Sequence, residues 1–345
     1  MSICFGMGCN MLDHYINWYK YSLEALDYVV ENIIDLGYAE RIVVTGLGGS
    51  GIVGDLLASI ASDYSNVVVH VYKDFYIPKT VLRKDSVVLA ISYSGNTLET
   101  VSSTLKALDK GSKVCVVTSG GRLLDIAKRR SLPYVVVRGD LVPRLAMPIM
   151  FIASLKLLSR CGIEIVPMDV ALSSINVLKD TENAKEIARE IIDYVSSSQI
   201  ITVVATSRFQ ALAYRIKDEF NENSKIPVKV EIAPELFHND IVGWENAKVR
   251  DVAILIDSDI LYENKLISFY NEYLKSIGLR TYILKLRGNI IERHLYGSLI
   301  AGIASVYLAQ IRGLNPVETK SIAMYKSRVK ELEKEFIVSN TSSSV

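Results

Sequence analysis

The chain lacks an excess of charge of either sign. Its 39 Lys and Arg residues nearly balance its 38 Asp and Glu residues, which leaves a formal net charge of +1 over 345 residues. A protein that binds nucleic acid or an anionic membrane as its main partner normally carries a basic surface. We therefore expect no nucleic-acid partner and no membrane partner.

Long apolar runs are also lacking. No uninterrupted segment approaches the roughly 18 apolar residues that cross a bilayer. The first ten residues lack the basic segment and apolar stretch of a secretory signal. These two features lead us to expect a cytoplasmic protein.

Cysteine and histidine are scarce, with four of each. Cys4 and Cys9 are not followed by a second Cys/His pair, so the spacing of a zinc site is missing. We expect no metal and no cofactor, and we expect Cys115 in the core because its neighbours are apolar. Glutamine occurs only three times; scarce amides hint at a thermophile, where a cytosolic disulfide among Cys4, Cys9 and Cys161 stays open.

The length and the apolar pattern predict two α/β domains. Half of the residues are apolar, and 345 residues suit two cores better than one. Short apolar runs alternate with helical patterns, as in a parallel, doubly wound sheet. The predicted strands are Arg41–Thr45, Val67–Val71, Ser86–Ile91, Lys113–Thr118 and Pro133–Val137, then Ile200–Ala205, Val228–Glu231, Val252–Ile256 and Thr281–Leu286. We place the domains at residues 1–162 and 179–338, with a leading helix and a C-terminal helix.

The segment 92–97 (SYSGNT) follows a predicted strand and precedes a predicted helix. Ser92, Ser94 and Thr97 place three hydroxyl groups within six residues at that helix N-terminus. Hydroxyl groups and backbone N–H groups at such a turn suit a phosphate. A helix capped by Ser or Thr without any ligand is the alternative; capping accounts for one hydroxyl but not for three.

A second glycine-rich turn, GLGGSG at 46–51, follows the first predicted strand. It matches the dinucleotide fingerprint G-x-G-x-x-G, which also needs an acidic residue at the end of the next strand. Asp74 comes a little late for that role. We therefore favour a sugar or phosphate at Gly49 and Ser50 over a dinucleotide.

Further candidates follow later in the sequence. Arg144 stands at the start of a helix after the fifth strand, so it can face the same sheet edge as the serines. Glu219 and Glu222 lie one turn apart near the end of a helix. His238 follows Pro234, which suggests a short helix. Each of these could equally be an ordinary surface or packed residue, as could Thr319, Lys320 and Lys326 in the last helical pattern.

Together these motifs resemble a known family. GLGGSG at 46–51, SYSGNT at 92–97, Pro143-Arg144, Asn221-Glu222-Asn223 with Lys225, PELFHN at 234–239 and Tyr325-Lys326 resemble the archaeal-type bifunctional phosphoglucose/phosphomannose isomerases. That resemblance implies two tandem sugar isomerase (SIS) domains, each a flavodoxin-like parallel sheet flanked by helices. It also implies an aldose–ketose isomerase that works without metal on glucose 6-phosphate and mannose 6-phosphate.

The resemblance also implies a role for each residue. Ser50, Ser92, Ser94 and Thr97 would bind the phosphate, and Glu222 would move the proton between C2 and C1. Arg144 would stabilise the enediolate, and Thr319 would admit the mannose substrate. Lys326, with Lys320 as a rival, would act at the ring oxygen. His238 would assist ring opening and would be donated by the neighbouring subunit of a homodimer.

Other functions stay open at this point. A non-catalytic phosphosugar-binding SIS regulator would keep the phosphate loop, but the DNA-binding domain expected beside it is not evident. A glucosamine 6-phosphate-type isomerase normally needs a nitrogen source, and no glutaminase segment is visible. A dinucleotide oxidoreductase is the least favoured.

Overall fold

A computed structural model describes residues 7–37, 39–246 and 252–329, and side chains from residue 11 onward. Cys4 therefore lies outside the described residues, as does the side chain of Cys9. Among the described cysteines, Cys115 and Cys161 are both buried and free. This confirms the core position of Cys115.

The N-terminal half forms a six-stranded sheet in the order β1-β6-β5-β4-β2-β3. Five strands are parallel, and only the two-residue β1 pairs antiparallel, with β6. The strands are β1 (Val30–Glu31), β2 (Arg41–Thr45), β3 (Val68–Tyr72), β4 (Val87–Ser92), β5 (Lys113–Thr118) and β6 (Tyr134–Val136). The predicted strands are confirmed within one or two residues at each end; β1 was not predicted.

Helices surround this sheet on both faces. The helices are α1 (Met7–Ile16), α2 (Trp18–Glu24), α3 (Gly48–Tyr64), α4 (Leu98–Asp109), α5 (Gly121–Arg129) and α6 (Met147–Arg160), with the 3-10 turn η1 (Pro143–Ala146) before α6. Helix α3 begins at Gly48, within the glycine-rich motif. The last four residues of the motif therefore form the first turn of α3.

The C-terminal half forms a four-stranded parallel sheet in the order β10-β9-β7-β8. Its strands are β7 (Ile201–Thr206), β8 (Val228–Ala233), β9 (Val252–Ile256) and β10 (Arg280–Leu284). Its helices are α8 (Thr181–Val195), α9 (Gln210–Ser224), α10 (Asp240–Gly243), α11 (Leu261–Ser276) and α12 (Ile290–Ile311), and η3 (Ser207–Phe209) and η4 (Glu235–His238) are 3-10 turns. Helix α7 (Met168–Ser174) and the turn η2 (Ile175–Lys179) connect the two halves.

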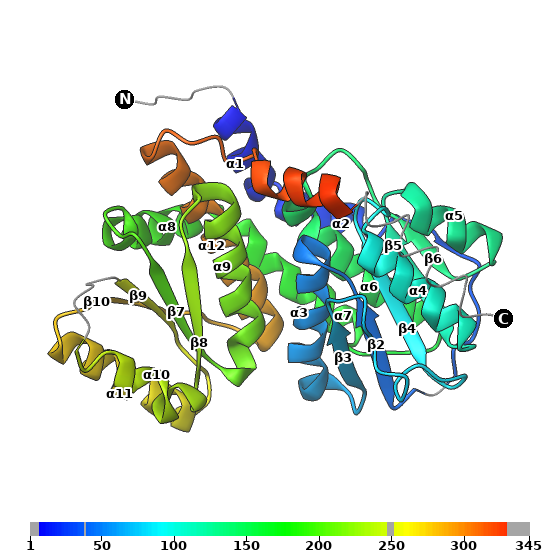
Figure 1. Ribbon diagram of the computed structural model, residues 1–345, viewed down its shortest axis with the longest axis horizontal. Helices are drawn as coiled ribbons and strands as arrows, with labels where there is room; N and C mark the ends of the chain where they lie inside the picture. Colours follow the sequence, from blue (N-terminus) through cyan, green and yellow to red (C-terminus); the bar gives the residue numbers. More distant parts are fainter. Residues whose placement is uncertain (1–6, 38, 247–251, 330–345) are drawn as a thin grey trace.

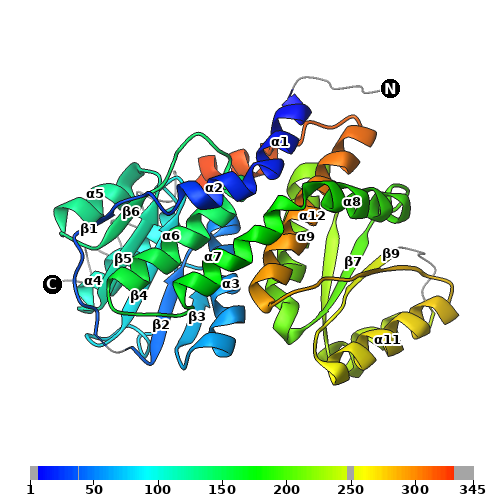
Figure 2. The ribbon, with the colours of Figure 1, turned by 180° about the vertical axis from the view of Figure 1, so that it is seen from behind.

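The two sheets share one apolar core. A single cluster of buried side chains runs from Ile42 and Val44 of β2 to Ile201 and Val203 of β7. Figure 1 shows the two sheets as separate lobes, with α3 and α9 facing each other between them. The view from behind in Figure 2 shows α6 and α7 on the side away from α4. Residues of both halves therefore meet along an apolar interface.

Helix α12 is the most apolar helix of the described chain. By length and hydropathy it is sufficient to cross a membrane, but 83% of its apolar window is buried inside the protein. It packs against α8, α9 and α1. This burial makes α12 a core helix.

Candidate active site

The SYSGNT segment forms the turn between β4 and α4. Thr97 occupies the N-cap position of α4, but its side chain makes no capping hydrogen bond. Instead, Ser92 Oγ donates to Thr97 Oγ1 across 3.2 Å, and Ser94 is exposed. Gly95 adopts a φ of +65°, and a Cβ at this position would collide with the carbonyl oxygen of Gly120. The alternative of a simple Thr-capped helix is therefore wrong, because no side chain of the N-cap residue satisfies the backbone N–H groups of the first turn of α4.

The glycine-rich turn packs directly beside the SYSGNT turn. Ser50 is 4% exposed, and its Oγ accepts a hydrogen bond from the backbone N–H of Tyr93 at 2.9 Å. The hydroxyl hydrogen of Ser50 has only the thioether of Met150 nearby, at 3.7 Å, which is a weak acceptor. Ser50 thus joins the two turns and still has a donor that a ligand could use.

Gly49 brings the same turn against Arg144. A Cβ at Gly49 would lie 2.8 Å from the carbonyl oxygen of Pro143 and 2.9 Å from the backbone nitrogen of Arg144. Real side chains do not make such contacts, so glycine is required at this position. The sequence suggested that the backbone approaches an anion here; the structure shows that it approaches η1.

Arg144 reaches across the interface to α9 of the other half. Its Nη1 lies 2.9 Å from Glu222 Oε2, its Nε donates to Asn223 Oδ1 at 2.7 Å, and its Nη2 donates to the carbonyl of Pro316 at 2.7 Å. The side chain of Arg144 is 5% exposed and that of Glu222 is 23% exposed. A buried guanidinium and a solvent-accessible carboxylate therefore form one pair beside the glycine-rich turn.

Glu219 has a different environment from Glu222. It is completely buried, and its two oxygens accept hydrogen bonds from Tyr15, Arg215 and Asn223. Burial raises the pKa of Glu219, and the nearby Arg215 opposes the rise. Glu219 lies one turn from Glu222 on the same helix, but a ligand cannot reach it because its side chain is buried.

Lys225 holds the segment that follows α12. Its Nζ donates to the carbonyl of Glu222 at 2.8 Å and to the carbonyl of Asn315 at 2.6 Å. Burial lowers the pKa of Lys225, and the charge of Arg144 lowers it further. Together, Lys225 and Arg144 fix residues 315 and 316 close to Glu222.

The last described helix, residues 320–329, returns to the N-terminal half. Tyr325 Oη donates to Glu99 Oε1 at 2.5 Å, and Glu99 lies in the first turn of α4. In Figure 1 this helix crosses from the end of α12 toward the other lobe. Thr319 is half-buried, Lys326 is exposed, and Lys320 is exposed and pairs with Glu318 at 3.4 Å. Thr319 and Lys326 therefore belong to a segment that runs from the neighbourhood of Arg144 to the SYSGNT turn.

His238 does not join the other candidates within this chain. It ends η4, which follows β8, and its side chain is exposed. Glu222 lies three residues before Lys225, near the start of β8, so the length of the strand separates the two residues. Six strand residues span about 17 Å. The predicted short helix after Pro234 is confirmed, but His238 and Glu222 lie at opposite edges of the sheet.

Comparisons with known proteins identify the family. The SIS domain family matches residues 36–123, and the bacterial phospho-glucose isomerase C-terminal SIS domain matches residues 180–329. The bifunctional phosphoglucose/phosphomannose isomerase of Aeropyrum pernix is 34% identical over 93% of this chain and 98% of the relative. The protein of the same name from Pyrobaculum aerophilum is 31% identical over 92% and 99%. The chain belongs to this isomerase family.

Solved structures agree on the fold. The C-terminal domain of glucosamine-fructose-6-phosphate aminotransferase from Francisella tularensis has a TM-score of 0.69 at 15% identity, covering 88% of this chain and 96% of that one. Glucosamine-6-phosphate deaminase from Thermotoga maritima has a TM-score of 0.67 at 13% identity, covering 90% and 96%. Together with the family matches, these likenesses confirm two SIS domains with parallel sheets flanked by helices.

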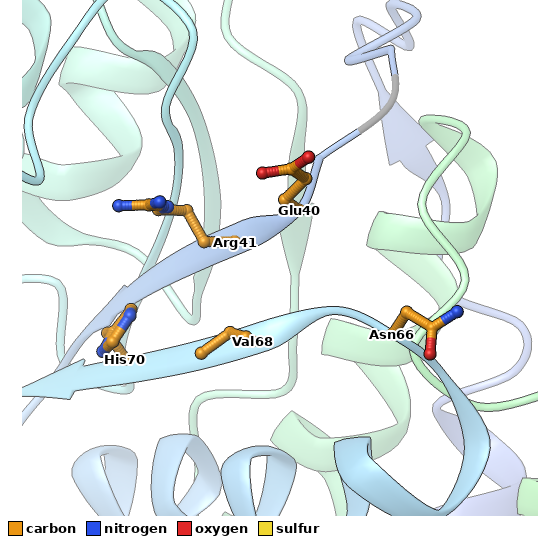
Figure 3. A pocket seen from close by; sticks show the side chains of 5 residues that line it. All are labelled: Glu40, Arg41, Asn66, Val68 and His70. Carbon is orange, nitrogen blue, oxygen red and sulfur yellow. The ribbon is translucent and has the colours of Figure 1, made fainter.

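Two surface cavities lie away from the residues that this isomerase family suggests. One, of about 410 Å³, lies at the amino ends of β2 and β3, and Figure 3 shows its lining by Glu40, Arg41, Asn66, Val68 and His70. The other, of about 510 Å³, lies between α8 and the end of α12. Ser50 and the SYSGNT turn occupy the carboxyl edge of the first sheet, opposite the cavity of Figure 3. We assign neither cavity to the site.

Tyr15 and Arg215 were missed by the sequence analysis. Tyr15 and Asn223 contact each other across 208 residues of sequence, a relation that no local pattern encodes. Arg215 and Glu219 are four residues apart on α9, and this spacing could have indicated their ion pair. Among the described residues, no group of three or more His, Cys, Asp or Glu side chains is placed to hold a metal.

Proposed function

We propose that this protein interconverts glucose 6-phosphate and mannose 6-phosphate with fructose 6-phosphate. Relatives that match nearly the whole chain bear the name of this isomerase. The observation that carries the proposal is the contact of Arg144 with Glu222 at 2.9 Å beside the two polar turns. A base and a fixed cation beside an anion-binding turn are what an enediolate isomerisation requires.

Phosphate binding falls to the two turns of the first domain. The hydroxyl groups of Ser50, Ser92, Ser94 and Thr97 donate to the phosphate, and Gly49 keeps the turn close to Arg144. The N-terminus of α4, whose N-cap side chain makes no capping bond, adds a favourable dipole. Because the phosphate does not react, its binding energy orients the sugar for the proton transfer.

The proton transfer falls to Glu222. Its carboxylate removes the proton from C2 of the open-chain aldose, so that a C1=C2 double bond forms and the carbonyl electron pair moves onto O1. Arg144 stabilises the charge that develops on O1, because its guanidinium is already held in place and needs no reorganisation. A proton then passes from the C2 hydroxyl group to O1, the carbonyl forms at C2, and Glu222 returns its proton to C1. The protons lost at C2 and O2 equal those gained at C1 and O1, so the reaction balances without a cofactor.

Ring opening and the acceptance of mannose 6-phosphate are assigned to residues other than Arg144 and Glu222. Lys326 acts at the ring oxygen of the sugar. Tyr325 supports this role because it anchors the helix of residues 320–329. Thr319 allows mannose 6-phosphate to bind as a substrate. His238 assists ring opening from the neighbouring subunit of a homodimer, because its own chain holds it at the far edge of the sheet. We also propose domains of residues 1–162 and 179–338 and a cytoplasmic location.

The decisive experiment is a direct assay of the purified, chelator-treated protein. Fructose 6-phosphate formation is measured from glucose 6-phosphate and from mannose 6-phosphate in separate reactions. We expect turnover of both. Turnover of glucose 6-phosphate alone would remove the second activity and the role of Thr319. Binding without any turnover would favour the phosphosugar regulator instead.

One more substrate belongs in that assay. A relative from Sulfolobus acidocaldarius, 27% identical over 93% of this chain and 99% of its own length, is named D-glucosamine-6-phosphate 4-epimerase. We therefore include glucosamine 6-phosphate, for which we expect no conversion. Conversion of this compound in preference to glucose 6-phosphate and mannose 6-phosphate would overturn the proposed function.

A further inference from the structure

Arg144 is held by a buried network that begins on the first helix of the chain. We propose that Tyr15, Arg215 and Glu219 are positioning residues, which orient the amide of Asn223 so that it holds the guanidinium of Arg144 opposite Glu222. This inference rests on the proposed function, in which Arg144 and Glu222 act on the sugar. None of these positioning residues touches the substrate.

The amide of Asn223 is the link between the network and Arg144. Its Oδ1 accepts from Arg144 Nε at 2.7 Å, and its Nδ2 lies 2.9 Å from Glu219 Oε2 and 2.8 Å from Ser305 Oγ. An arginine side chain only donates hydrogen bonds, and an ionised carboxylate only accepts them. Asn223 therefore satisfies both neighbours in one orientation alone, because the flipped amide would face Arg144 with a donor.

Glu219 sets that orientation because both of its oxygens accept hydrogen bonds from the protein. It accepts from Tyr15 Oη at 2.5 Å and from Arg215, whose side chain is 2% exposed. Burial raises the pKa of Glu219, and the nearby guanidinium of Arg215 opposes that rise. Arg215 Nη2 also donates to the carbonyl of Arg144 at 2.7 Å. The network thus holds both the side chain and the backbone of Arg144.

Tyr15 ties this network to α1. Its ring is fully buried against Trp18 and against Gly302 of α12, where a side chain would collide with the ring. Trp18 Nε1 donates to the carbonyl of Leu145 at 3.0 Å, next to Arg144. Trp18 therefore contacts the turn that carries Arg144 directly, and Tyr15 reaches Arg144 through Asn223.

Stability alone does not account for this arrangement. Arg215 is buried, and its Nε and Nη1 atoms have no hydrogen-bond partner in the described structure. Buried ion pairs generally contribute no more stability than apolar residues of the same size, and unpaired buried donors are costly. A requirement for one fixed orientation of Arg144 explains why such a network occupies the interface.

The first test removes one hydroxyl group. Tyr15→Phe keeps the ring but removes its donor to Glu219, and the matched control Tyr28→Phe removes a similar donor to Glu24, 2.6 Å away, outside the site. We expect a roughly 10- to 100-fold lower kcat in Tyr15→Phe, as for a misplaced catalytic group. We expect KM and the affinity for glucitol 6-phosphate, which has no carbonyl to isomerise, to stay nearly unchanged.

A kinetic isotope effect separates positioning from folding. With glucose 6-phosphate deuterated at C2, Tyr15→Phe is expected to show a larger isotope effect on kcat than the wild type, because proton transfer has become slower. Tyr28→Phe should match the wild type in both kcat and isotope effect. If Tyr15→Phe has the kcat and isotope effect of the wild type, or if both variants lose kcat equally, the inference is overturned.

A second test exchanges the amide and the carboxylate. Glu219→Gln places a donor against the donor of Asn223, and Asn223→Asp places a carboxylate against Glu219, so each single variant should lose kcat. The double variant has one donor and one acceptor again and should recover at least roughly tenfold over either single variant, since coupled neighbours are not additive. No recovery in a folded double variant would contradict the proposed orientation.

The failure of this inference is distinguishable from the failure of the proposed function. Absence of turnover by the wild type would overturn the proposed function and this inference together. Turnover by the wild type with an unaffected Tyr15→Phe variant would overturn the inference alone. Circular dichroism and thermal unfolding of every variant establish that the folded proteins are being compared.

Discussion

Glu219 and Glu222 lie one turn apart on α9, yet their surroundings assign them opposite roles. Glu219 has no exposed surface and contacts protein donors at both oxygens, whereas the side chain of Glu222 is 23% exposed and pairs with Arg144. A base must reach the proton that it removes. The difference in access between these two carboxylates therefore selects Glu222.

Glu222→Gln tests this selection with the shape of the side chain preserved. We expect kcat for both hexose phosphates to fall by roughly 10²–10⁴-fold, the usual contribution of a general base. The affinity for glucitol 6-phosphate should remain nearly intact, because the phosphate turns lie elsewhere. Glu182→Gln, an exposed substitution on α8, is the control. Full activity of Glu222→Gln would show that the base is another residue.

Asp218 gives the fold a pH dependence of its own. Burial raises the pKa of Asp218 to about 6, with a contribution from Glu222 that Arg215 opposes. The folded chain therefore holds this proton more tightly than the unfolded chain, whose carboxyl group has its ordinary lower pKa. It follows that the free energy of unfolding falls as the pH rises from about 4 through 6.

Asp218→Asn should remove this decrease in the free energy of unfolding at higher pH. We expect the variant to gain on the order of 1–2 kcal/mol in unfolding free energy at pH 7.5 and little at pH 4. Urea unfolding at the two pH values measures the difference, and Asp193→Asn, an exposed site on α8, is the control. An equal gain at both pH values would mean that Asp218 does not hold the proton as described.

Residues of local motifs were predictable from the sequence, and their long-range partners were not. Ser92, Ser94 and Thr97 follow a strand directly, so their place at one sheet edge follows from strand order. Tyr15 reaches Glu219 only because α1 packs on α12, and that packing is set by many distant side chains together. The roles assigned to Glu222, His238 and Lys326 stay predictions.

At the scale of elements, the carboxyl edges of the two sheets differ in charge. In the first sheet this edge carries the hydroxyl groups of the SYSGNT turn. In the second sheet, Thr206 Oγ1 and Ser258 Oγ donate to Glu263 Oε2 at 2.8 and 2.5 Å, and Asp257 and Asp259 lie beside them. The hydroxyl groups of the second sheet already donate to the carboxylate of Glu263, and the negative charge of that carboxylate disfavours the binding of a phosphate.

One phosphosugar should therefore bind per chain despite the two SIS domains. Calorimetric titration with glucitol 6-phosphate is expected to give a stoichiometry of one in the wild type and in Glu263→Gln. Ser92→Ala, a change in the first sheet only, should weaken that single binding event. A stoichiometry of two in the wild type would refute the proposed difference between the edges.

Elements with a strong apolar pattern were predicted well. The boundaries of β2, β5 and β9 match the predictions, because each is a regular run between turn residues. The two-residue β1 is too short for any periodic signal. Helix α8 was not predicted from the sequence, although it follows the helical period. Its buried residues are Ala184, Ala188, Ile191, Ile192 and Val195.

At the scale of the whole molecule, the two halves present different edges to the site. The first half contributes the carboxyl edge of its sheet, and the second half contributes the end of α9, which is the amino edge of its sheet. His238 stands at the carboxyl edge of the second sheet, about 17 Å along β8. One chain therefore brings Arg144 and Glu222 together but leaves His238 outside their reach.

In a homodimer, His238 of each subunit could instead contact the active site of the neighbouring subunit. Glu222→Gln and His238→Ala should then be almost inactive separately but should restore activity when they are mixed under conditions that exchange subunits. Half of the randomly formed dimers would be mixed, and each would contain one intact site, so about a quarter of the wild-type activity is expected.

The same mixture also tests the alternative arrangement, in which His238 acts in the active site of its own chain. If His238 served the site of its own chain, every site in a mixed dimer would carry one of the two substitutions, and the mixture would stay inactive. Mixing each variant with wild-type protein provides the control for subunit exchange. Because the two arrangements differ in whether any intact site forms, an inactive mixture with proven exchange would refute the donation of His238 across a dimer interface.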